Sequence, residues 1–459
     1  MARPTCPAVA LGVLGILSAR CWSQEPSPQA IPTAEAFVDH LAGADLAAAQ
    51  AMFHEAVAAA LPVAKLQETW DGVVAAARAF QERVESKASR LQGYDVVLVT
   101  CRFAGGALDI RVVLDDQQRI AGLQFLPHEE APPYQLPDYA HPDTYTERDV
   151  TVGEGQWALP GTLTMPNGDG PFPAVVLVHG SGPQDRDETI GPNKPFRDLA
   201  VGLASRGIAV LRYEKRTKAH GAEVAAILDR LTAREETTDD ALLAVALLRA
   251  TPGLGPQRLY VLGHSQGGQL APRIAVADPA IAGLIIMAGP ARPLEDLVLD
   301  QLTYLLPQQI ADPNEAAKQL AEVRAQVARV KSPDLTLDTP RTELPLGIPA
   351  SFWLDVRDYH PAEVARDLPQ RILVIQGGRD YQVTEADFAL WQQALAGRPN
   401  AQLKLYPDLS HLFAPGAGKA TPTEYLTEAK HVSAEVIGDI ATWVLGPAGS
   451  AGPEGGGQP

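Results

Sequence analysis

Cysteine is scarce in this chain of 459 residues, which contains only three. Cys6 and Cys21 lie in an N-terminal segment with the features of a cleaved leader, so Cys101 alone is expected to remain. A single cysteine excludes an intramolecular disulfide. Cys101 lies in an alternating strand pattern, which predicts a buried structural thiol rather than a nucleophile.

An excess of basic residues is also absent. The formal net charge is -17 at pH 7 and the isoelectric point is near 5.0. Nucleic acids and anionic membrane surfaces attract positive charge, so this balance disfavours both as partners. Hydrophobic residues at 46% are typical of a globular protein, and the length predicts two or three domains.

The N-terminal apolar run, residues 8–17, is well under the roughly 20 residues that a spanning helix needs. A basic start before it and a small-residue site near Ser23 after it are typical of a secretory signal peptide at 1–23. A lipoprotein anchor through Cys21 is the alternative, but Arg20 is a poor match to the small residue expected before it. We therefore expect a secreted or periplasmic protein with no membrane span in its mature form.

Residues 33–127 predict a small α+β domain. The Ala-rich stretch 33–90, after a linker at 24–32, has helical spacing and indicates two or three helices. An antiparallel meander follows, with expected strands at 96–103, 107–114 and 120–126. Histidines, cysteines and carboxylates do not cluster in this segment, so we expect an accessory or packing role.

A Pro-rich connector at 128–142 leads into a second domain at 143–446. Short, almost wholly apolar strands alternate there with helices, which indicates an α/β fold with a mostly parallel sheet covered on both faces. The expected strands are residues 146–152, 158–165, 174–178, 208–211, 258–262, 284–288, 372–376 and 403–406. The expected helices are residues 196–206, 239–249, 266–276, 387–396 and 423–445.

An insertion at about 290–370 interrupts this alternation. Helical spacing at 294–306 and 314–331 is followed by a Pro-broken stretch, and we expect the insertion to form a cap that lines a pocket. The Gly- and Pro-rich tail at 447–459 predicts disorder.

Residues 259–268, with the sequence LYVLGHSQGG, carry the strongest catalytic signal. An apolar strand delivers Ser265 into a turn flanked by Gly263 and Gly267, and a helix can start directly afterwards. Side chains at the two glycine positions would collide with neighbouring chain, and so sharp a turn strains the residue at its apex. The pattern predicts a nucleophile elbow with Ser265 as the nucleophile.

A serine nucleophile needs a histidine base that is oriented by a carboxylate, and the expected chain order is serine, acid, histidine. Asp380 follows the apolar strand 372–376, and His411 follows the strand 403–406. Both lie at the sheet edge toward which Ser265 points. We therefore expect these three residues to form a catalytic triad.

Other residues compete for two of these roles. Asp380 could instead cap the helix that follows it, with Asp408 as the reserve acid. His360 and His431 are less suitable bases than His411, because the first lies in the cap and the second inside the expected final helix.

An oxyanion hole is expected from the backbone N–H groups of Ser181 and Gln266. Gln266 follows the nucleophile at the start of a helix, whose dipole favours negative charge. Ser181 lies in the Gly-containing turn after the strand 174–178, where Gly182 is an alternative donor. His179 in the same turn is expected to be structural. This chemistry requires neither metal nor cofactor.

Three further segments carry a resemblance: HGSGPQDRDE at 179–188, GPNKPF at 191–196 and LRYEKR at 211–216. Together they resemble a branch of secreted bacterial esterases in the α/β-hydrolase superfamily, which often carry a small N-terminal module of unassigned function. The resemblance covers about 143–445. It implies an α/β-hydrolase fold and carboxylesterase activity on short acyl esters. It also implies a small-molecule ester substrate, no cofactor, and the triad already named.

The charged residues of these segments have a structural interpretation that we favour over substrate binding. They are expected to form ion pairs that fix the loop over the oxyanion turn. The residues concerned are Asp185, Arg186, Asp187, Lys194 and Arg197.

Aromatic residues near the expected site are candidates for its apolar walls. Phe352, Trp353 and Tyr359 belong to the cap, and Tyr381 lies beside the expected acid. The cap aromatics suit the core of a cap equally well.

Two other functions fit the same pattern. A serine peptidase or aminopeptidase would use the same triad, although the N-terminal module is too small for a propeller gate. A non-catalytic binding protein that kept the fold is the other alternative, and the intact triad argues against it. Dehalogenases and epoxide hydrolases are disfavoured, because they place a carboxylate where Ser265 stands.

Overall fold

The computed structural model describes residues 26–91, 94–128, 134–310 and 312–446. The expected leader and C-terminal tail lie outside these residues. The chain divides into two compact units, residues 23–131 and residues 132 onward, so the boundary falls inside the expected connector. Among the described residues, no helix is long and apolar enough to cross a bilayer.

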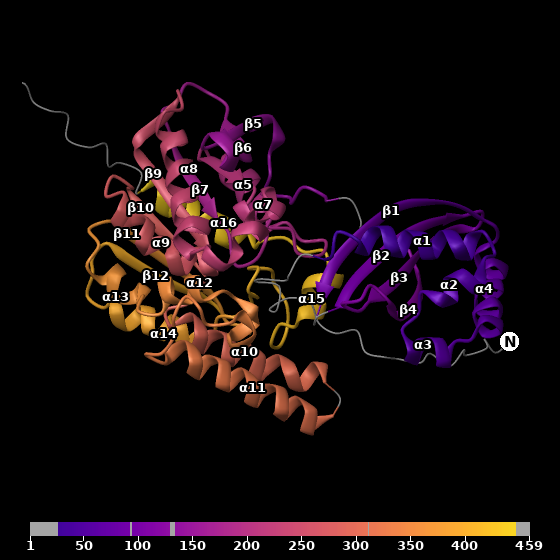
Figure 1. The fold of residues 1–459 in the computed structure, drawn as a ribbon. Helices are drawn as coiled ribbons and strands as arrows, with labels where there is room; N and C mark the ends of the chain where they lie inside the picture. Colours follow the sequence, from indigo (N-terminus) through magenta and orange to yellow (C-terminus); the bar gives the residue numbers. More distant parts are fainter. Residues whose placement is uncertain (1–25, 92–93, 129–133, 311, 447–459) are drawn as a thin grey trace, which may run out of the picture. The chain divides into compact units, whose positions relative to one another are not determined.

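The N-terminal unit packs helices against an antiparallel sheet of order β1-β2-β3-β4 (Figure 1). Its elements are α1 (Ala30–Ala42), α2 (Leu46–Ala51), α3 (Glu55–Ala60), α4 (Val63–Ala77), β1 (Phe80–Leu91), β2 (Tyr94–Phe103), β3 (Gly106–Leu114) and β4 (Ile120–Pro127). Alternate residues of β2, such as Val97 and Val99, are buried in one core with Phe37 and Trp70. Cys101 is fully buried there, and burial raises the pKa of its thiol to about 12, which confirms a structural thiol.

Two boundaries in this unit correct the sequence-based expectation. Helix α1 begins at Ala30, inside the expected linker, and β1 replaces the helix expected up to residue 90. The sequence of β1, FQERVESKASRL, has few apolar residues, and two register irregularities interrupt its pairing with β2. No period of two is therefore visible in it, and this edge strand takes its conformation from its neighbour.

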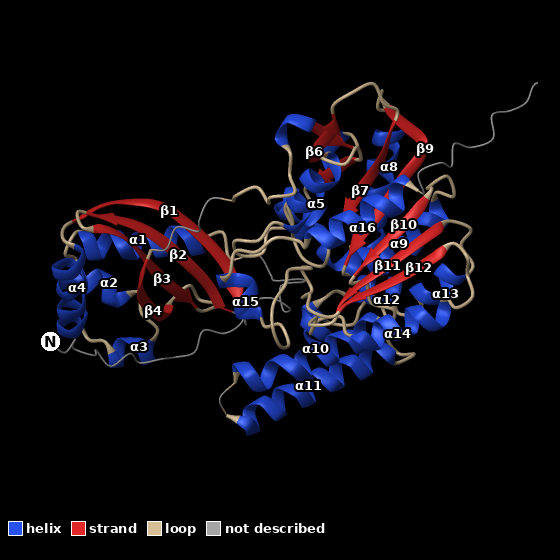
Figure 2. Ribbon diagram, turned by 180° about the vertical axis from the view of Figure 1, so that it is seen from behind, coloured by secondary structure: helices blue, strands red, loops and turns tan. Residues whose placement is uncertain are grey.

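The second unit is built on an eight-stranded sheet of order β12-β11-β10-β9-β7-β8-β6-β5, which confirms the expected α/β fold (Figure 2). Strands β7 to β12 are parallel, and β5 and β6 add an antiparallel edge. The strands are β5 (Tyr145–Val152), β6 (Leu159–Pro166), β7 (Phe172–Val178), β8 (Ala209–Tyr213), β9 (Leu254–His264), β10 (Gly283–Met287), β11 (Arg371–Gly377) and β12 (Ala401–Tyr406).

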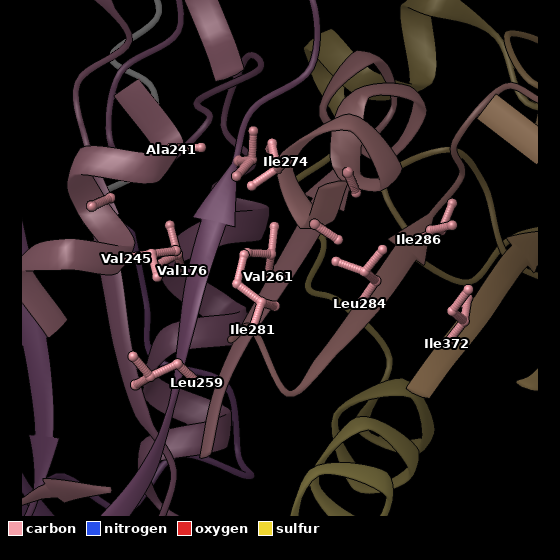
Figure 3. Packing of buried hydrophobic residues seen from close by; sticks show 14 of the residues in the cluster. Val176, Ala241, Val245, Leu259, Val261, Ile274, Ile281, Leu284, Ile286 and Ile372 are labelled. Carbon is pink, nitrogen blue, oxygen red and sulfur yellow. The ribbon is translucent and has the colours of Figure 1, made fainter. Parts of the chain in front are cut away.

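Two apolar cores lie on opposite faces of this sheet. Figure 3 shows one of them, where Val176, Val261 and Leu284 of neighbouring strands face Val245 of α8 (Asp239–Arg249) and Ile274 of α9 (Gln266–Ala277). Helices α5 (Pro195–Ala204) and α16 (Ala434–Leu445) cover the other face. Because both faces of the central strands are covered, β7, β10 and β11 are buried at nearly every residue rather than at alternate ones, whereas the edge strands β5 and β12 are partly exposed.

The insertion forms two helices that pack on each other, α10 (Leu294–Gln309) and α11 (Pro313–Lys331) (Figures 1 and 2). Short helices follow in and after it. They are α12 (Ala350–Val356), α13 (Pro361–Arg366) and α14 (Glu385–Ala394). The first two were not expected, because one or two turns leave no clear helical period in the sequence.

The expected final helix is two helices, α15 (Pro422–Thr427) and α16. Between them, the backbone N–H of Lys430 donates to Asn193 Oδ1 at 2.8 Å, and that of Val432 donates to Asp198 Oδ2 at 2.8 Å. These tertiary hydrogen bonds replace helical ones. His431 therefore lies in a loop rather than in a helix, with Nδ1 3.0 Å from Asp198 Oδ1.

The expected site residues meet at the carboxyl ends of the parallel strands. Val178 of β7 pairs with Gly263 of β9, and Met287 of β10 pairs with His264 of β9. The last residue of β11, Gly377, pairs with Tyr406 at the end of β12. The turns that follow these strands carry Ser181, Ser265, Asp380 and His411. This edge is where open α/β sheets bind ligands.

Candidate active site

Ser265 occupies a sharp turn between β9 and α9. Its backbone has φ 52° and ψ −117°, a conformation that residues other than glycine rarely adopt. A Cβ at Gly263 would lie 2.1 Å from Gly267 O, and one at Gly267 would lie 2.2 Å from Val178 O. Glycine is therefore required at both positions, and the turn has the geometry of a nucleophile elbow.

Asp380 and His411 come together as a buried hydrogen-bonded pair. His411 Nδ1 donates to Asp380 Oδ2 at 2.6 Å. Asp380 Oδ1 accepts from the backbone N–H groups of Gln382 at 2.7 Å and Val383 at 3.0 Å, and Gln376 Nε2 donates to Oδ2 at 3.1 Å. The carboxylate is thus held from both sides, and the ring orientation of His411 is fixed by it.

The structure brings Ser265 to the same strand ends but records no hydrogen bond between its hydroxyl and any described residue, His411 included. The residue before the serine, His264, has its ring centre 4.6 Å from that of His411. Hydrogen bonds of this kind are commonly long in ligand-free enzymes and shorten when substrate binds. The second ring nitrogen of His411, Nε2, also has no partner among the described residues.

A cavity opens directly on Ser265. The room inside it for the centres of water-sized molecules is about 30 Å³, so the cavity is narrow. Both expected oxyanion residues, Ser181 and Gln266, line it beside the serine. Its other lining residues are Pro290, Leu294, Leu297, Val298, Gln301, Leu346, Ile348, Phe352 and Gln382. None of these lining residues is charged, and the apolar ones all come from the expected cap.

Of the four aromatic residues proposed as pocket walls, Phe352 lines this cavity. Trp353 and Tyr359 belong instead to the apolar core of the cap, and the Tyr359 hydroxyl donates to Gln269 O at 2.9 Å. Tyr381 is stacked between Tyr304 and Tyr425, with ring centres 5.2 and 5.9 Å away. Trp353 and Tyr359 thus follow the core alternative that the sequence left open, and Tyr381 is the candidate that does not line the cavity, since large aromatic side chains gain most by packing in a core.

A second buried pair, Glu188 and His264, was not expected from the sequence. Glu188 Oε2 lies 2.8 Å from His264 Nδ1, and Glu188 Oε1 accepts from the backbone N–H of Gly180 at 2.7 Å. The other nitrogen of His264, Nε2, donates to the carbonyl oxygen of His411 at 3.0 Å. Burial lowers the pKa of His264, but the Glu188 carboxylate outweighs it and the net pKa is raised. Burial raises the pKa of Glu188, and His264 more than reverses this.

A buried lysine was missed as well. Lys215 follows β8, and its ammonium donates to Gly180 O at 2.8 Å and to Gln266 Oε1 at 3.1 Å. Its counter-ion is Glu236, at 3.2 Å, in the π-helix Arg234–Thr238. Glu188 and Lys215 both lie in the segments that carried the family resemblance, which is the only signal that could have singled them out.

The charged loop forms the ion pairs that its sequence predicted. Asp187 accepts from Lys194 at 3.2 Å and from the buried Arg212, and it lies 4.0 Å from Arg197. Arg186 Nε donates to Glu214 at 2.8 Å. Asp185 Oδ1 accepts from backbone N–H groups of its own loop. These contacts confirm the expected ion pairs at Arg186, Asp187, Lys194 and Arg197, whereas Asp185 fixes the loop through backbone hydrogen bonds instead.

The remaining histidines considered have other surroundings. His179 is buried with Nε2 3.1 Å from Asp185 O, and burial lowers its pKa to about 4, so it is neutral and suits a structural role. His360 precedes α13 in the cap. Over the described part of the chain, His, Cys, Asp and Glu form no group of three or more that could hold a metal ion.

Comparison with known proteins places this geometry in a family. Residues 175–421 match the family model described as "Alpha/beta hydrolase family". The chain is also similar to Esterase EstD of Thermotoga maritima, with 40% identity over 409 residues that cover 89% of this chain and 94% of the relative. The chain belongs to the α/β-hydrolase family. The resemblance found in the sequence is thereby confirmed, whereas secretion stays a prediction.

The N-terminal unit of this α/β-hydrolase matches, over residues 34–123, the model described as "Protein of unknown function (DUF3887)". Among solved structures, an esterase of Pyrococcus furiosus is 14% identical with a TM-score of 0.41, over 66% of this chain and 91% of that one. Dipeptidyl peptidase 4 of Porphyromonas gingivalis is 13% identical with a TM-score of 0.43, over 79% and 43%. Structural similarity with such low identities and TM-scores does not support any inference about function.

Proposed function

We propose that this α/β-hydrolase is a serine carboxylesterase that hydrolyses short-chain esters through an acyl-serine intermediate. The observation that carries the proposal is the elbow serine at the mouth of a cavity, with a buried Asp380–His411 pair at the same strand ends. Similarity to an esterase over most of the chain supports it. The leader pattern adds the proposal that the enzyme is exported.

The roles follow from the hydrogen bonds. Asp380 engages Nδ1 of His411, which leaves Nε2 as the nitrogen that takes the Ser265 proton. The serine oxygen then attacks the ester carbonyl, and the charge that develops on the carbonyl oxygen is held by the backbone N–H groups of Ser181 and Gln266. His411 returns the proton to the leaving alcohol. A water molecule, activated in the same way, releases the acid and restores the serine.

The chemistry of the cavity favours a small neutral acyl group. Its cap side is apolar, from Leu294, Leu297 and Phe352 among others, and no charged side chain lines it within the described chain. A carboxylate or ammonium on the acyl part would lose its hydration without gaining a partner. The absence of an acidic lining residue likewise disfavours an aminopeptidase, which must bind a free amino terminus.

The test is turnover of p-nitrophenyl esters of increasing acyl length by the wild type and by Ser265→Ala. We expect the variant to lose several orders of magnitude in kcat, while its thermal unfolding is unchanged. Ser332→Ala, in the loop after α11, is the matched control and should behave as wild type.

Three outcomes would contradict the proposal. Equal turnover by wild type and Ser265→Ala would exclude the serine. Cleavage of peptidyl amides in preference to p-nitrophenyl acetate would favour a peptidase. No reaction of Ser265 with a fluorophosphonate, together with no turnover of any ester, would favour a binding protein.

A further inference from the structure

We infer that Lys215 is a positioning residue for the oxyanion hole, because its buried ammonium holds the two segments whose N–H groups are the proposed donors. The inference rests on the proposed function. Its basis is one juxtaposition, in which Lys215 Nζ donates both to Gly180 O at 2.8 Å and to Gln266 Oε1 at 3.1 Å. One acceptor belongs to the turn after β7 and the other to the first residue of α9.

The contact with Gly180 acts on the proposed donor through a single peptide group. The carbonyl of Gly180 and the N–H of Ser181 belong to the same peptide bond, and this bond is not cis. In a trans peptide the C=O and N–H vectors point in opposite directions. An ammonium that holds the carbonyl on one side therefore directs the Ser181 N–H to the other. It also polarises the peptide, which makes that N–H a stronger donor.

The peptide on the other side of Gly180 is held too. The Gly180 N–H donates to Glu188 Oε1 at 2.7 Å, so charged groups of opposite sign engage the N–H and C=O of one residue. The backbone N–H of Lys215 adds a 3.0 Å hydrogen bond to Gln184 O in the same loop. A Cβ at Gly180 would lie 3.2 Å from Ser265 Cβ, so this residue is packed against the nucleophile. Small rotations of its peptides would thus be felt at the reacting centre.

Burial makes the arrangement rigid. The side chains of Lys215 and its partner Glu236 are 2% and 1% exposed, so neither charge can exchange its partner for water. A fixed positive charge behind the donors also favours the negative charge that develops on the carbonyl oxygen. Lys215 itself does not line the cavity and is not placed to touch substrate.

The test uses the full chain and the variant Lys215→Met/Glu236→Gln, which removes the ammonium without leaving a buried carboxylate unpaired. Loss of one oxyanion donor costs about 10²- to 10³-fold in kcat. Because Lys215 acts through the donors, we expect a kcat loss on the order of 10- to 100-fold with KM changed by less than about threefold. Lys218→Met, an exposed lysine in the adjacent α6 (Arg216–Ala219), is the matched control and should be unchanged.

A second readout separates positioning from general structural damage. A trifluoromethyl ketone forms a tetrahedral adduct with the serine that carries an oxyanion, whereas an unreactive amide analogue of the ester does not. We expect affinity for the ketone to fall in parallel with kcat, and affinity for the amide to stay as in the wild type. Equal losses for both ligands, or an unchanged kcat, would overturn the inference.

If the double variant does not fold, Gln266→Leu carries the test, because it removes one acceptor of Lys215 and changes no charge. A several-fold lower kcat with unchanged KM supports the inference, and an unchanged kcat overturns it. Failure of the underlying function is recognised separately. If Ser265→Ala keeps the turnover of the wild type, both the proposed function and the role of Lys215 are contradicted. If Ser265→Ala is inactive but the Lys215 variant is fully active, only the role of Lys215 is contradicted.

Discussion

Two carboxylate–histidine pairs lie next to each other at the strand ends, and they differ in what the second ring nitrogen does. Asp380 and His411 are 0% and 4% exposed, and Glu188 and His264 are 1% and 3% exposed, so burial does not distinguish them. His264 faces an acceptor at each nitrogen, Glu188 Oε2 and the carbonyl oxygen of His411. Within the described parts of the chain, His411 has an acceptor at Nδ1 alone.

This difference separates a base from a structural cation. Acceptors close to both ring nitrogens favour the doubly protonated form, so His264 suits a structural cation rather than a base, in agreement with its raised pKa. His411 keeps Nε2 available to accept a proton. His264 also donates to the backbone carbonyl of His411, so the Glu188–His264 pair helps to hold His411 in place. We therefore expect substitutions in the Asp380–His411 pair to stop turnover, and substitutions in the Glu188–His264 pair to reduce stability.

The largest contrast is expected between His411→Gln and His264→Gln. Removing the base should lower kcat/KM by on the order of 10⁴- to 10⁶-fold with little change in stability. Removing the structural cation leaves Glu188 buried without its partner and should cost about 3 kcal/mol in the free energy of unfolding. Its kcat should fall by only about 10- to 100-fold, because the base is displaced rather than lost. Urea unfolding and steady-state turnover measure both, and the reverse ranking would contradict the assignment.

The carboxylates give the next contrast, Asp380→Asn against Glu188→Gln. An asparagine at 380 keeps the shape but favours the wrong tautomer of His411, and kcat should fall by about 10⁴-fold. A glutamine at 188 keeps a hydrogen-bond acceptor for Gly180 but removes the charge that stabilises His264. We expect it to lower the unfolding free energy by about 2 kcal/mol and to lower kcat far less than Asp380→Asn does. Similar kcat values for the two variants would mean that the pairs are not functionally distinct.

The first pair could be anticipated from sequence, and the second could not. Asp380 and His411 each follow an apolar strand, and the ends of parallel strands share one edge, so local pattern and topology together brought them near Ser265. The glycines at 263 and 267 are likewise explained by local sterics. The fold class of the second unit was predictable for the same reason, since its signal is repeated in strand after strand.

What could not be anticipated depends on contacts between distant segments. Glu188 has a positive φ of 52° in an irregular loop, and its partner His264 stands 76 positions further along the chain. Lys215 meets one acceptor in the turn after β7 and one at the start of α9, and nothing in LRYEKR indicates which of its charges is buried. Strand β1 and the break between α15 and α16 are similar cases, because pairing with a neighbour and side-chain hydrogen bonds override local propensity.

The smallest effect expected is a pH window in the stability contributed by Glu188 and His264. The pKa of His264 is raised above its ordinary 6.5, so its contribution is complete below that value and is lost as pH rises through the folded-state pKa. The pKa of Glu188 is lowered below its ordinary 4.5, so its contribution is complete above that value and is lost as pH falls through the folded-state pKa. The stability difference between wild type and Glu188→Gln/His264→Gln should therefore be most favourable to the wild type from about pH 4.5 to 6.5 and decline on both sides. Urea midpoints across this range measure it, and a difference that does not vary with pH would show that the two residues are not charged partners.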